Sequence, residues 1–331
     1  MIRWAKWFRG KGNLVSVVSL TRTHDRSVYD IIQDVPAILG PFAYLRRGLF
    51  VRKVVKSLAP DIVHGHYLTS AGFFSSLTTC PHKVVSAWGS DIYSDAKVWS
   101  KRQCIKWAIN HSDVTLGDSD HIVNAVKQLV PKVDARKVIF GIDTELFKPN
   151  PIKHDKFRFL SIRATGGVYN SLTLVEAFEQ AGLDAELWMQ EPMADGCAVK
   201  DYVKSRPKLD RKVVWYSRRP YEEMPKLYNS CDVALSVPEW DSSSAALNEA
   251  LSCGLLVVAS DIPQNREWIV DKKNGFLASS FTLPDVMSKA SQLHMDAVVS
   301  MGRNARQTIV EKADFNKEMD KAEAIYREVA D

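Results

Sequence analysis

The feature that most constrains the fold of this chain is a repeated alternation of short apolar runs with amphipathic helical segments. The runs that we interpret as strands lie at 15–20, 61–67, 83–89, 113–119, 137–142, 157–163, 185–190, 212–217, 232–237 and 255–260. Helical periodicity lies between them, for example at 45–58, 98–110, 120–129, 171–181, 221–230, 244–253 and 303–328. Strands that alternate with helices form βαβ units with parallel sheets. The ten predicted strands are more than one such sheet usually contains, which favours two sheets.

The length of 331 residues suits two such domains. The segment 147–157 has two prolines and mixed charge, which is typical of a linker. We predict an α/β protein with two doubly wound, Rossmann-like domains, at 1–148 and 149–309, with a helix at 310–331 rejoining the first. A doubly wound domain normally opens with a strand, but residues 1–13 have a helical pattern, so we expect the first strand to be missing.

Composition excludes several other classes of protein. With 46% hydrophobic and 25% charged residues, the chain is neither disordered nor collagen-like nor a coiled coil. Its five cysteines form no C-x-x-C pair, which fits a reducing cytosol better than a disulfide framework. No apolar run is long enough to span a membrane, and charges interrupt the N-terminus where a signal peptide would be apolar. We therefore expect a cytoplasmic protein.

Charge is distributed unevenly along the chain. Residues 1–150 carry 21 basic and 12 acidic side chains, a net charge of +9. Residues 151–331 carry 23 basic and 27 acidic side chains, a net charge of −4. The stretches 1–13 and 44–58 are both basic and amphipathic. Their basic faces are either simply solvated or bind an anionic membrane surface through residues 1–60, on the inner face of the plasma membrane. Nucleic acid is the less favoured partner, because no stripe of aromatics interleaved with arginine is present.

The most informative stretch is SVPEWDSSSAALNEALSCGLLVVASDIPQNREWI, at 236–269. A strand ends at Val237, a serine-rich turn follows, and a helix begins near Ser244. The N–H groups at a helix start and nearby hydroxyls suit a diphosphate, and Glu249 on the helix could accept hydrogen bonds from ribose hydroxyls. The alternative is that the serines only cap the helix and that Glu249 is solvated.

This stretch resembles the signature of retaining glycosyltransferases of the GT-B fold, family 4. That family has an acidic residue, seven residues, a glutamate, and then a helix and strand similar to those after Glu249. Further segments occur in the family's order, at 60–67, 86–93, 141–149, 161–178 and 271–277. The resemblance therefore covers most of the chain.

The resemblance implies catalytic roles for four residues. Arg163 would neutralise the departing diphosphate, Asp241 would contact hydroxyls of the transferred sugar, Glu249 would bind the ribose, and His66 would face the reacting sugar. Other donor-binding residues would hold the base and the diphosphate; these are Tyr169, Asn170, Ser217, Arg218, Arg219, Ser242, Ser243, Ser244 and Ala245. Gly89, Ser90 and Asp91 would lie on the acceptor side with His66.

The chain departs from the family's pattern at several points. No lysine follows Arg163 within the next seven residues, where the family has a second diphosphate cation. Tyr169 and Asn170 occupy that region, so Arg218 or Arg219 would share the task. Asp241 replaces the commoner glutamate, and a serine-rich turn replaces a glycine-rich one. The family also has a strand and a glycine-rich turn ahead of the first helix.

Two patterns that resemble metal sites have simpler explanations. Asp118-Ser119-Asp120 spells D-x-D, but it lies between a strand and a helix, where we predict that it caps the helix. His64 and His66 have no third ligand at a useful spacing. We expect no metal and no cofactor beyond the nucleotide diphosphate sugar.

Taken together, the resemblance predicts a hexosyltransferase that moves a sugar, most simply from a UDP-sugar, to a glycan or lipid-linked acceptor with retention of configuration. Such a reaction belongs to the synthesis of cell-surface polysaccharide or glycolipid. The alternative is a catalytically degenerate GT-B protein that acts as a binding or scaffold subunit.

Overall fold

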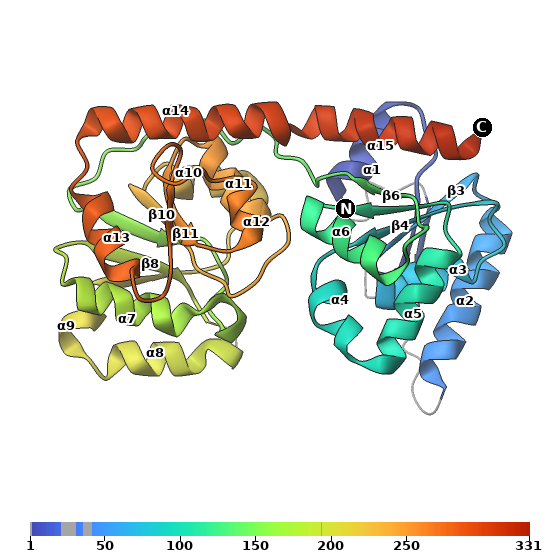
Figure 1. Ribbon diagram of the computed structural model, residues 1–331, viewed down its shortest axis with the longest axis horizontal. Helices are drawn as coiled ribbons and strands as arrows, with labels where there is room; N and C mark the ends of the chain where they lie inside the picture. Colours follow the sequence, from blue (N-terminus) through green and yellow to red (C-terminus); the bar gives the residue numbers. More distant parts are fainter. Residues whose placement is uncertain (1, 21–30, 36–41, 193) are drawn as a thin grey trace. The chain divides into compact units, whose positions relative to one another are not determined.

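A computed structural model describes residues 2–20, 31–35, 42–192 and 194–331. The chain divides into two compact units (Figure 1). Unit 1 comprises residues 1–139 and 317–331, and unit 2 comprises 140–316. The chain thus leaves unit 1 before the predicted linker at 147–157. The reason is that Phe147 is fully buried within unit 2, where its carbonyl oxygen accepts hydrogen bonds from Ser252 Oγ (2.6 Å) and Arg306 Nη1 (2.9 Å).

Unit 2 is built on a parallel six-stranded sheet with the order β12-β11-β10-β7-β8-β9. Its strands are β7 (Arg158–Ser161), β8 (Glu186–Gln190), β9 (Val213–Tyr216), β10 (Val233–Ser236), β11 (Leu256–Ser260) and β12 (Phe276–Ala278). Its main helices are α7 (Ser171–Ala181), α8 (Cys197–Lys204), α10 (Met224–Tyr228), α11 (Ala245–Ser252), α13 (Leu283–Ser291) and α14 (Met295–Lys312). Short helices α9 (Pro207–Asp210) and α12 (Pro263–Arg266) complete the unit. In Figure 1, α7 and α8 lie on one side of this sheet and α11 and α14 on the other.

The core of unit 2 explains why its central strands are continuous apolar runs. Strand β10 lies between β7 and β11, with Val233 opposite both Phe159 and Leu256. All three side chains are at most 2% exposed. A strand with helices on both faces is buried on both faces, so it needs apolar residues throughout and shows no alternation.

Unit 1 contains a parallel four-stranded sheet with the order β3-β4-β5-β6 and a separate parallel pair, β1 and β2. The strands are β1 (Ser16–Ser19), β2 (Ile31–Asp34), β3 (Ile62–His66), β4 (His82–Ala87), β5 (Val114–Gly117) and β6 (Ala135–Lys137). The helices are α1 (Ile2–Gly10), α2 (Ala43–Leu58), α3 (Phe73–Ser76), α4 (Ser90–Tyr93), α5 (Trp99–Asn110), α6 (Asp120–Leu129) and α15 (Phe315–Ala330). Most of α15 belongs to this unit.

Helix α15 is fastened to unit 1 by both polar and aromatic contacts. Glu318 is 1% exposed and accepts a hydrogen bond from the backbone N–H of Ile139, at 2.8 Å. Tyr326 stacks on Phe8 of α1, with ring centroids 5.0 Å apart, and its hydroxyl hydrogen-bonds to His64 of β3. Helices α1 and α15 therefore cover the same part of the sheet.

Several elements differ from the predictions. Strands β2 and β12 were not predicted, because runs of four and three residues give little alternation to detect. The strand predicted at 137–142 is instead β6, at Ala135–Lys137. The helix predicted at 303–328 is two helices, α14 and α15, because Asp314 pairs with Ile142 as an isolated bridge.

Candidate functional site

Strand order places the predicted donor residues of unit 2 together. Successive strands run outward from β7 to β9 on one side and from β10 to β12 on the other, so the order reverses between β7 and β10. Ligands of such sheets bind beyond the carboxyl ends of the strands at this switch point. Arg163 follows β7 and the segment 241–245 follows β10. The local geometry of these two segments therefore defines the candidate site.

Arg163 is the centre of this group. Its Nη2 lies 3.0 Å from Asp241 Oδ2, and its Nη1 donates a hydrogen bond to Ser244 Oγ. Its guanidinium carbon lies 4.4 Å from the ring centroid of Tyr169. The side chains of Arg163 and Asp241 are 13% and 11% exposed. Two loops are thus joined by an ion pair that is largely withdrawn from water.

Asp241 is under opposing influences. Burial raises its pKa, whereas the positive charge of Arg163 and a hydrogen bond from the Ser242 N–H, at 2.9 Å, act to lower it. Desolvation is the largest of these effects. Burial of both charges therefore limits how strongly the two side chains hold each other.

The three serines directly precede α11. Ser244 caps the helix, since its Oγ accepts a hydrogen bond from the Leu247 N–H at 3.3 Å, and Ser243 Oγ accepts one from Asn248 Nδ2 at 3.3 Å. The first N–H groups of a helix lack acceptors within the helix and carry its positive dipole end. The capping interpretation of Ser244 is confirmed. It does not exclude an anion at Ser243, Ser244 and Ala245, because capping leaves other N–H groups at the helix start.

Glu249 is not a solvated helix residue. It is 7% exposed, and Tyr228 donates a hydrogen bond to its Oε2 at 2.9 Å. Burial and the negative charge of Glu249 raise the pKa of Tyr228 well above its ordinary value, so Tyr228 stays protonated as a donor. Tyr228 was not predicted to act at the site, since nothing in the sequence of α10 places it beside α11.

Tyr169 and Asn170 occupy the loop where family 4 has its second cation. Asn170 has a left-handed backbone (φ 50°) at the start of α7, and its Nδ2 donates to the Val237 carbonyl oxygen at 3.1 Å. Tyr169 lies against the Arg163 guanidinium. Asn170 thus connects the loop after β7 to the loop after β10, and Tyr169 orients the Arg163 guanidinium. Neither residue adds a positive charge.

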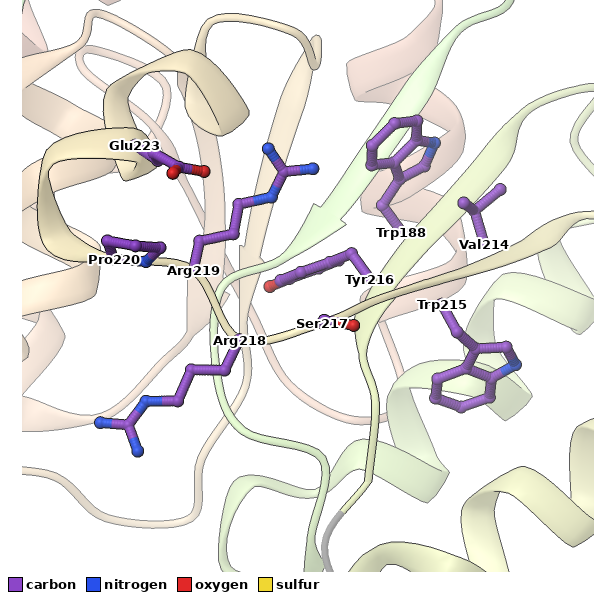
Figure 2. A pocket seen from close by; sticks show the side chains of 9 residues that line it. All are labelled: Trp188, Val214, Trp215, Tyr216, Ser217, Arg218, Arg219, Pro220 and Glu223. Carbon is purple, nitrogen blue, oxygen red and sulfur yellow. The ribbon is translucent and has the colours of Figure 1, made fainter.

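The loop 217–219, which follows the edge strand β9, lines a pocket of about 590 Å³ (Figure 2). The pocket residues are Trp188, Val214, Trp215, Tyr216, Ser217, Arg218, Arg219, Pro220 and Glu223. Figure 2 shows Arg219 extending on the same side as Glu223, while Arg218 points the other way. Tyr216 joins the pocket to β7, because its hydroxyl donates to the Ser161 carbonyl oxygen at 3.0 Å.

The aromatic lining of this pocket was not predicted. Trp188 lies on β8, and Trp215 and Tyr216 lie on β9, the neighbouring strand. Burial raises the pKa of Tyr216, and the charge of Arg219 acts in the opposite direction. Trp215 and Tyr216 directly precede the predicted base-binding loop 217–219, which is the signal that could have identified part of this wall. Trp188 joins it only through the pairing of β8 with β9.

His66 belongs to unit 1, where it lies in an aromatic cluster. Its ring centroid is 3.9 Å from that of His64 and 5.9 Å from those of Trp4 and Trp88. Burial lowers the pKa of His66 well below its ordinary value, and the neighbouring His64 lowers it further. Its Nδ1 is buried and has no hydrogen-bond partner within the described part of the chain. His66 is thus a neutral imidazole that can donate or accept one hydrogen bond without being a cation.

The predicted acceptor-side loop is held from inside by Asp91. Asp91 is 0% exposed, and its carboxylate accepts hydrogen bonds from the N–H groups of Leu68 (3.0 Å), Trp88 (3.0 Å) and Ile92 (3.1 Å). Burial raises its pKa while these N–H groups act to lower it. Asp91 therefore supports the loop from within, and its place on the acceptor side stays a prediction.

Gly89 is buried in the same loop, and the partly buried Ser90 begins α4. Gly89 has φ 99°, a left-handed conformation that glycine adopts without a Cβ clash. Ser90 Oγ donates to Tyr67 Oη at 3.2 Å, and Tyr67 donates to Asp95 Oδ2 at 3.0 Å. Tyr67 itself has φ 78°, which is uncommon for a bulky residue. Neither Tyr67 nor Asp95 was predicted to act at the site, although Tyr67 directly follows His66.

The two patterns that resembled metal sites have other roles. Ser119 caps α6, since its Oγ accepts a hydrogen bond from the Ile122 N–H at 3.2 Å, as predicted. His64 instead bonds to Ser86 Oγ, at 2.7 Å, and to Tyr326. Over the residues that the structure describes, no three His, Cys, Asp or Glu side chains are grouped to hold a metal ion.

Comparison with protein families matches both parts of the chain. Residues 142–308 match the sequence model of the family described as glycosyl transferases group 1, and residues 1–119 match that of glycosyl transferase 4-like proteins. No curated protein matches the sequence.

Solved structures match almost the whole chain. Sucrose-phosphate synthase from Thermosynechococcus elongatus is 12% identical with a TM-score of 0.83, covering 99% of this chain and 92% of that one. A glycosyltransferase from Rickettsia africae is 18% identical with a TM-score of 0.81, covering 99% and 93%. Anabaena HepE in complex with UDP-glucose is 17% identical with a TM-score of 0.80, covering 98% and 94%.

Proposed function

Because the chain belongs to the glycosyl transferases group 1 family and has the GT-B fold of family 4-like glycosyltransferases, we propose that it transfers a hexosyl group from a nucleotide diphosphate sugar with retention of configuration. The donor is most simply a UDP-sugar, as the Anabaena neighbour binds UDP-glucose. The acceptor is a glycan or a lipid-linked sugar. The observation that carries the proposal is the buried Arg163 side chain, which bonds to the capping serine of α11 at the switch point.

The donor would occupy the site in three parts. Its diphosphate would lie on Arg163 and the first N–H groups of α11, where a helix dipole and a guanidinium both attract oxygen anions. Its ribose would bind Glu249, which Tyr228 orients. Its base would enter the pocket beside Ser217 and Arg219, against the aromatic wall.

Catalysis would then follow from charge placed where the leaving group forms. The bond between the anomeric carbon and the diphosphate oxygen breaks, and Arg163 stabilises the negative charge that develops on that oxygen. The acceptor hydroxyl attacks the same face of the sugar, and its proton passes to the departing diphosphate. Asp241 would hold hydroxyls of the transferred sugar, and neutral His66 would offer that sugar one hydrogen bond. No metal or other cofactor is invoked in this scheme.

Donor turnover in two variants tests the site. We expect Arg163→Ala and Glu249→Ala each to lower turnover of UDP-sugars at least about tenfold, since each removes a side chain that would contact the donor. Arg266→Ala is the control, because this arginine lies in the same unit but pairs with Asp261 at an exposed position. Retention of full turnover by both site variants would refute the assignment.

A binding or scaffold subunit is the second candidate function. It is favoured by one observation, the absence of a lysine in the loop that follows Arg163. Incubation with UDP-, GDP- and ADP-sugars separates the two candidates. A transferase releases nucleoside diphosphate slowly even without acceptor, whereas a scaffold releases none and is not stabilised against heat by any of these nucleotides.

We place the reaction in the synthesis of cell-surface polysaccharide or glycolipid, in the cytoplasm or peripherally on the inner face of the plasma membrane. Across the described ranges, no helix has both the length and the apolar character needed to cross a membrane. The excess of basic residues in the first 150 supports an anionic surface as a partner. Fractionation of cells into soluble and membrane pools, with and without a high-salt wash, tests this placement.

A further inference from the structure

Helix α2 presents an outer face that is apolar at one end and basic at the other. We propose that this face binds the surface of a bilayer containing anionic phospholipid. It consists of Phe42, Leu45, Leu49, Arg52, Lys53 and Lys56. The inference rests on the peripheral membrane placement in the proposed function and assigns that contact to α2, and vesicle binding can succeed or fail independently of donor turnover.

The inner face of α2 packs against the core of unit 1. Gly48, Val51 and Val55 are the buried residues of the helix, and both valines pack in a core cluster with Phe74 and Cys80. A Cβ on Gly48 would lie only 3.2 Å from Phe74 and Leu77, so the helix approaches α3 closely. The orientation of α2 is thus fixed by its inner face, which leaves the outer residues directed away from the core.

Large apolar side chains are exposed on the outer face. Phe42, Leu45 and Leu49 are 77%, 53% and 55% exposed. Leu45 and Leu49 are four residues apart and therefore neighbours on the helix surface. Phe42 precedes the first turn with φ 67°, a conformation that is uncommon for an aromatic residue and places its ring in solvent. Such a group would insert into the boundary between lipid headgroups and acyl chains.

The charge of α2 has a single sign. Residues 43–58 contain five basic side chains and no acidic one. Arg52, Lys53 and Lys56 are exposed, and within the described ranges none of them forms an ion pair. Their charge is therefore available to an anionic surface, where each basic side chain strengthens binding about fivefold.

Helix α1, the other basic stretch, is arranged differently. Its Trp4 and Ala5 are buried, and Lys11 at its end lies 3.8 Å from Asp320 and 3.6 Å from Glu323 of α15. Acidic residues of α15 thus partly neutralise it. The structure narrows the predicted membrane contact from residues 1–60 to α2, although 21–30 and 36–41 lie outside the described residues.

A lipid surface fits this face better than a second copy of the chain or a nucleic acid. Two copies would bring basic residues of the same sign together. A nucleic acid would use the charges but would leave Leu45 and Leu49 in contact with water. A bilayer with anionic headgroups, unlike these two, offers partners to both halves of the face.

Co-sedimentation of the full chain with vesicles tests the proposal. We expect binding to phosphatidylcholine vesicles containing about 30% phosphatidylglycerol and much weaker binding to phosphatidylcholine alone. We expect the triple variant Arg52→Gln/Lys53→Gln/Lys56→Gln to bind the anionic vesicles about a hundredfold more weakly, because each of the three lost charges contributes about fivefold. Equal binding of the unmodified chain to both vesicles would overturn the proposal.

A matched variant removes the same charge elsewhere. Arg102→Gln/Lys127→Gln/Lys132→Gln alters three exposed basic residues on and after other helices of unit 1. It should bind the anionic vesicles within about twofold of the unmodified chain, since these residues lie far from α2 in sequence and on different elements. If it loses as much binding as the α2 variant, binding follows net charge alone and the proposal is wrong.

Leu45→Gln/Leu49→Gln tests the apolar half. Both positions are more than half exposed, so the variant should keep its melting temperature. It should lose the vesicle binding that survives in 0.5 M salt, because screening removes the charge contribution and leaves the apolar one. Unchanged binding would show a general polyanion site instead. Sedimentation velocity without lipid completes the test, since a dimer that this variant abolishes would assign the face to a second copy.

Discussion

Replacing Asp241 with asparagine leaves the Arg163 guanidinium buried without its counter-ion. In the native chain the two side chains are 3.0 Å apart and only 13% and 11% exposed. Asparagine keeps the shape of the side chain but removes its charge. The variant therefore isolates the electrostatic part of the interaction at the switch point.

The expected loss of stability is moderate. Removing one partner from a buried ion pair costs about 3–5 kcal/mol. The remaining contacts of Arg163 with Ser244 and Tyr169, and the burial that already raises the pKa of Asp241, reduce this to about 2–3 kcal/mol. For a domain of this size, about 2–4 °C per kcal/mol corresponds to a melting temperature lower by about 4–12 °C.

Added UDP should reverse much of this loss. If the diphosphate binds Arg163, it supplies the negative charge that the variant lacks and no longer competes with a carboxylate. We expect UDP to bind Asp241→Asn about tenfold more tightly than the native chain, which is about 1.4 kcal/mol of extra stabilisation at saturating ligand. Isothermal titration gives the affinity, and thermal denaturation with and without UDP gives the stabilisation.

The exposed pair Arg266–Asp261 provides the control. Asp261→Asn removes a carboxylate 2.6 Å from an arginine, but the side chains are 60% and 38% exposed, so the melting temperature should hardly change. UDP affinity should not change. Equal or weaker UDP binding by Asp241→Asn than by the native chain would refute the placement of the diphosphate on Arg163.

Three further predictions concern the groups around the two sites. Tyr228→Phe leaves the buried Glu249 carboxylate without its 2.9 Å hydrogen bond, so the melting curve should show a loss of about 1–3 kcal/mol and UDP affinity should fall; an unchanged affinity would remove Glu249 from the donor site. Burial lowers the pKa of His64 to about 3. Because the unfolded imidazole binds protons below about pH 6.5, unit 1 should lose stability as pH falls from 6.5 towards 3, and denaturant titrations of His64→Gln should show a flatter pH dependence. Asp91→Ala removes the carboxylate that accepts hydrogen bonds from the N–H groups of Leu68, Trp88 and Ile92, so hydrogen exchange at Leu68 should accelerate, whereas a merely exposed carboxylate would leave it unchanged.

The sequence predicted the parts of the fold that depend on long apolar or amphipathic runs. Helices α6 and α7 begin and end at the predicted residues, and β10 and β11 lie within the predicted runs. The break at Asp314 was not predictable, because its partner Ile142 is distant in sequence. Short strands such as β12 depend on pairing with a neighbour, here β11, more than on their own pattern.

The candidate site was predictable only where chemistry is carried by a local motif. Asp241 and Glu249 stand at a recognisable spacing, and the structure places Asp241 beside Arg163. By contrast, Tyr228 reaches Glu249 from a helix whose sequence contains no sign of it. The hydrogen bonds of Asp91 with backbone N–H groups were not predictable either, since only the folded loop shows which way its carboxylate points.

The docking of α15 has a consequence for the order of folding during synthesis. Unit 1 needs residues 317–331, which leave the ribosome after all of unit 2. Unit 2 can therefore fold before Tyr326 is available to hydrogen-bond to His64 of β3. The environment of the His64 imidazole is completed only when α15 docks. During that interval, unit 1 exposes apolar surface that a chaperone could bind, so its yield depends on how quickly synthesis is completed.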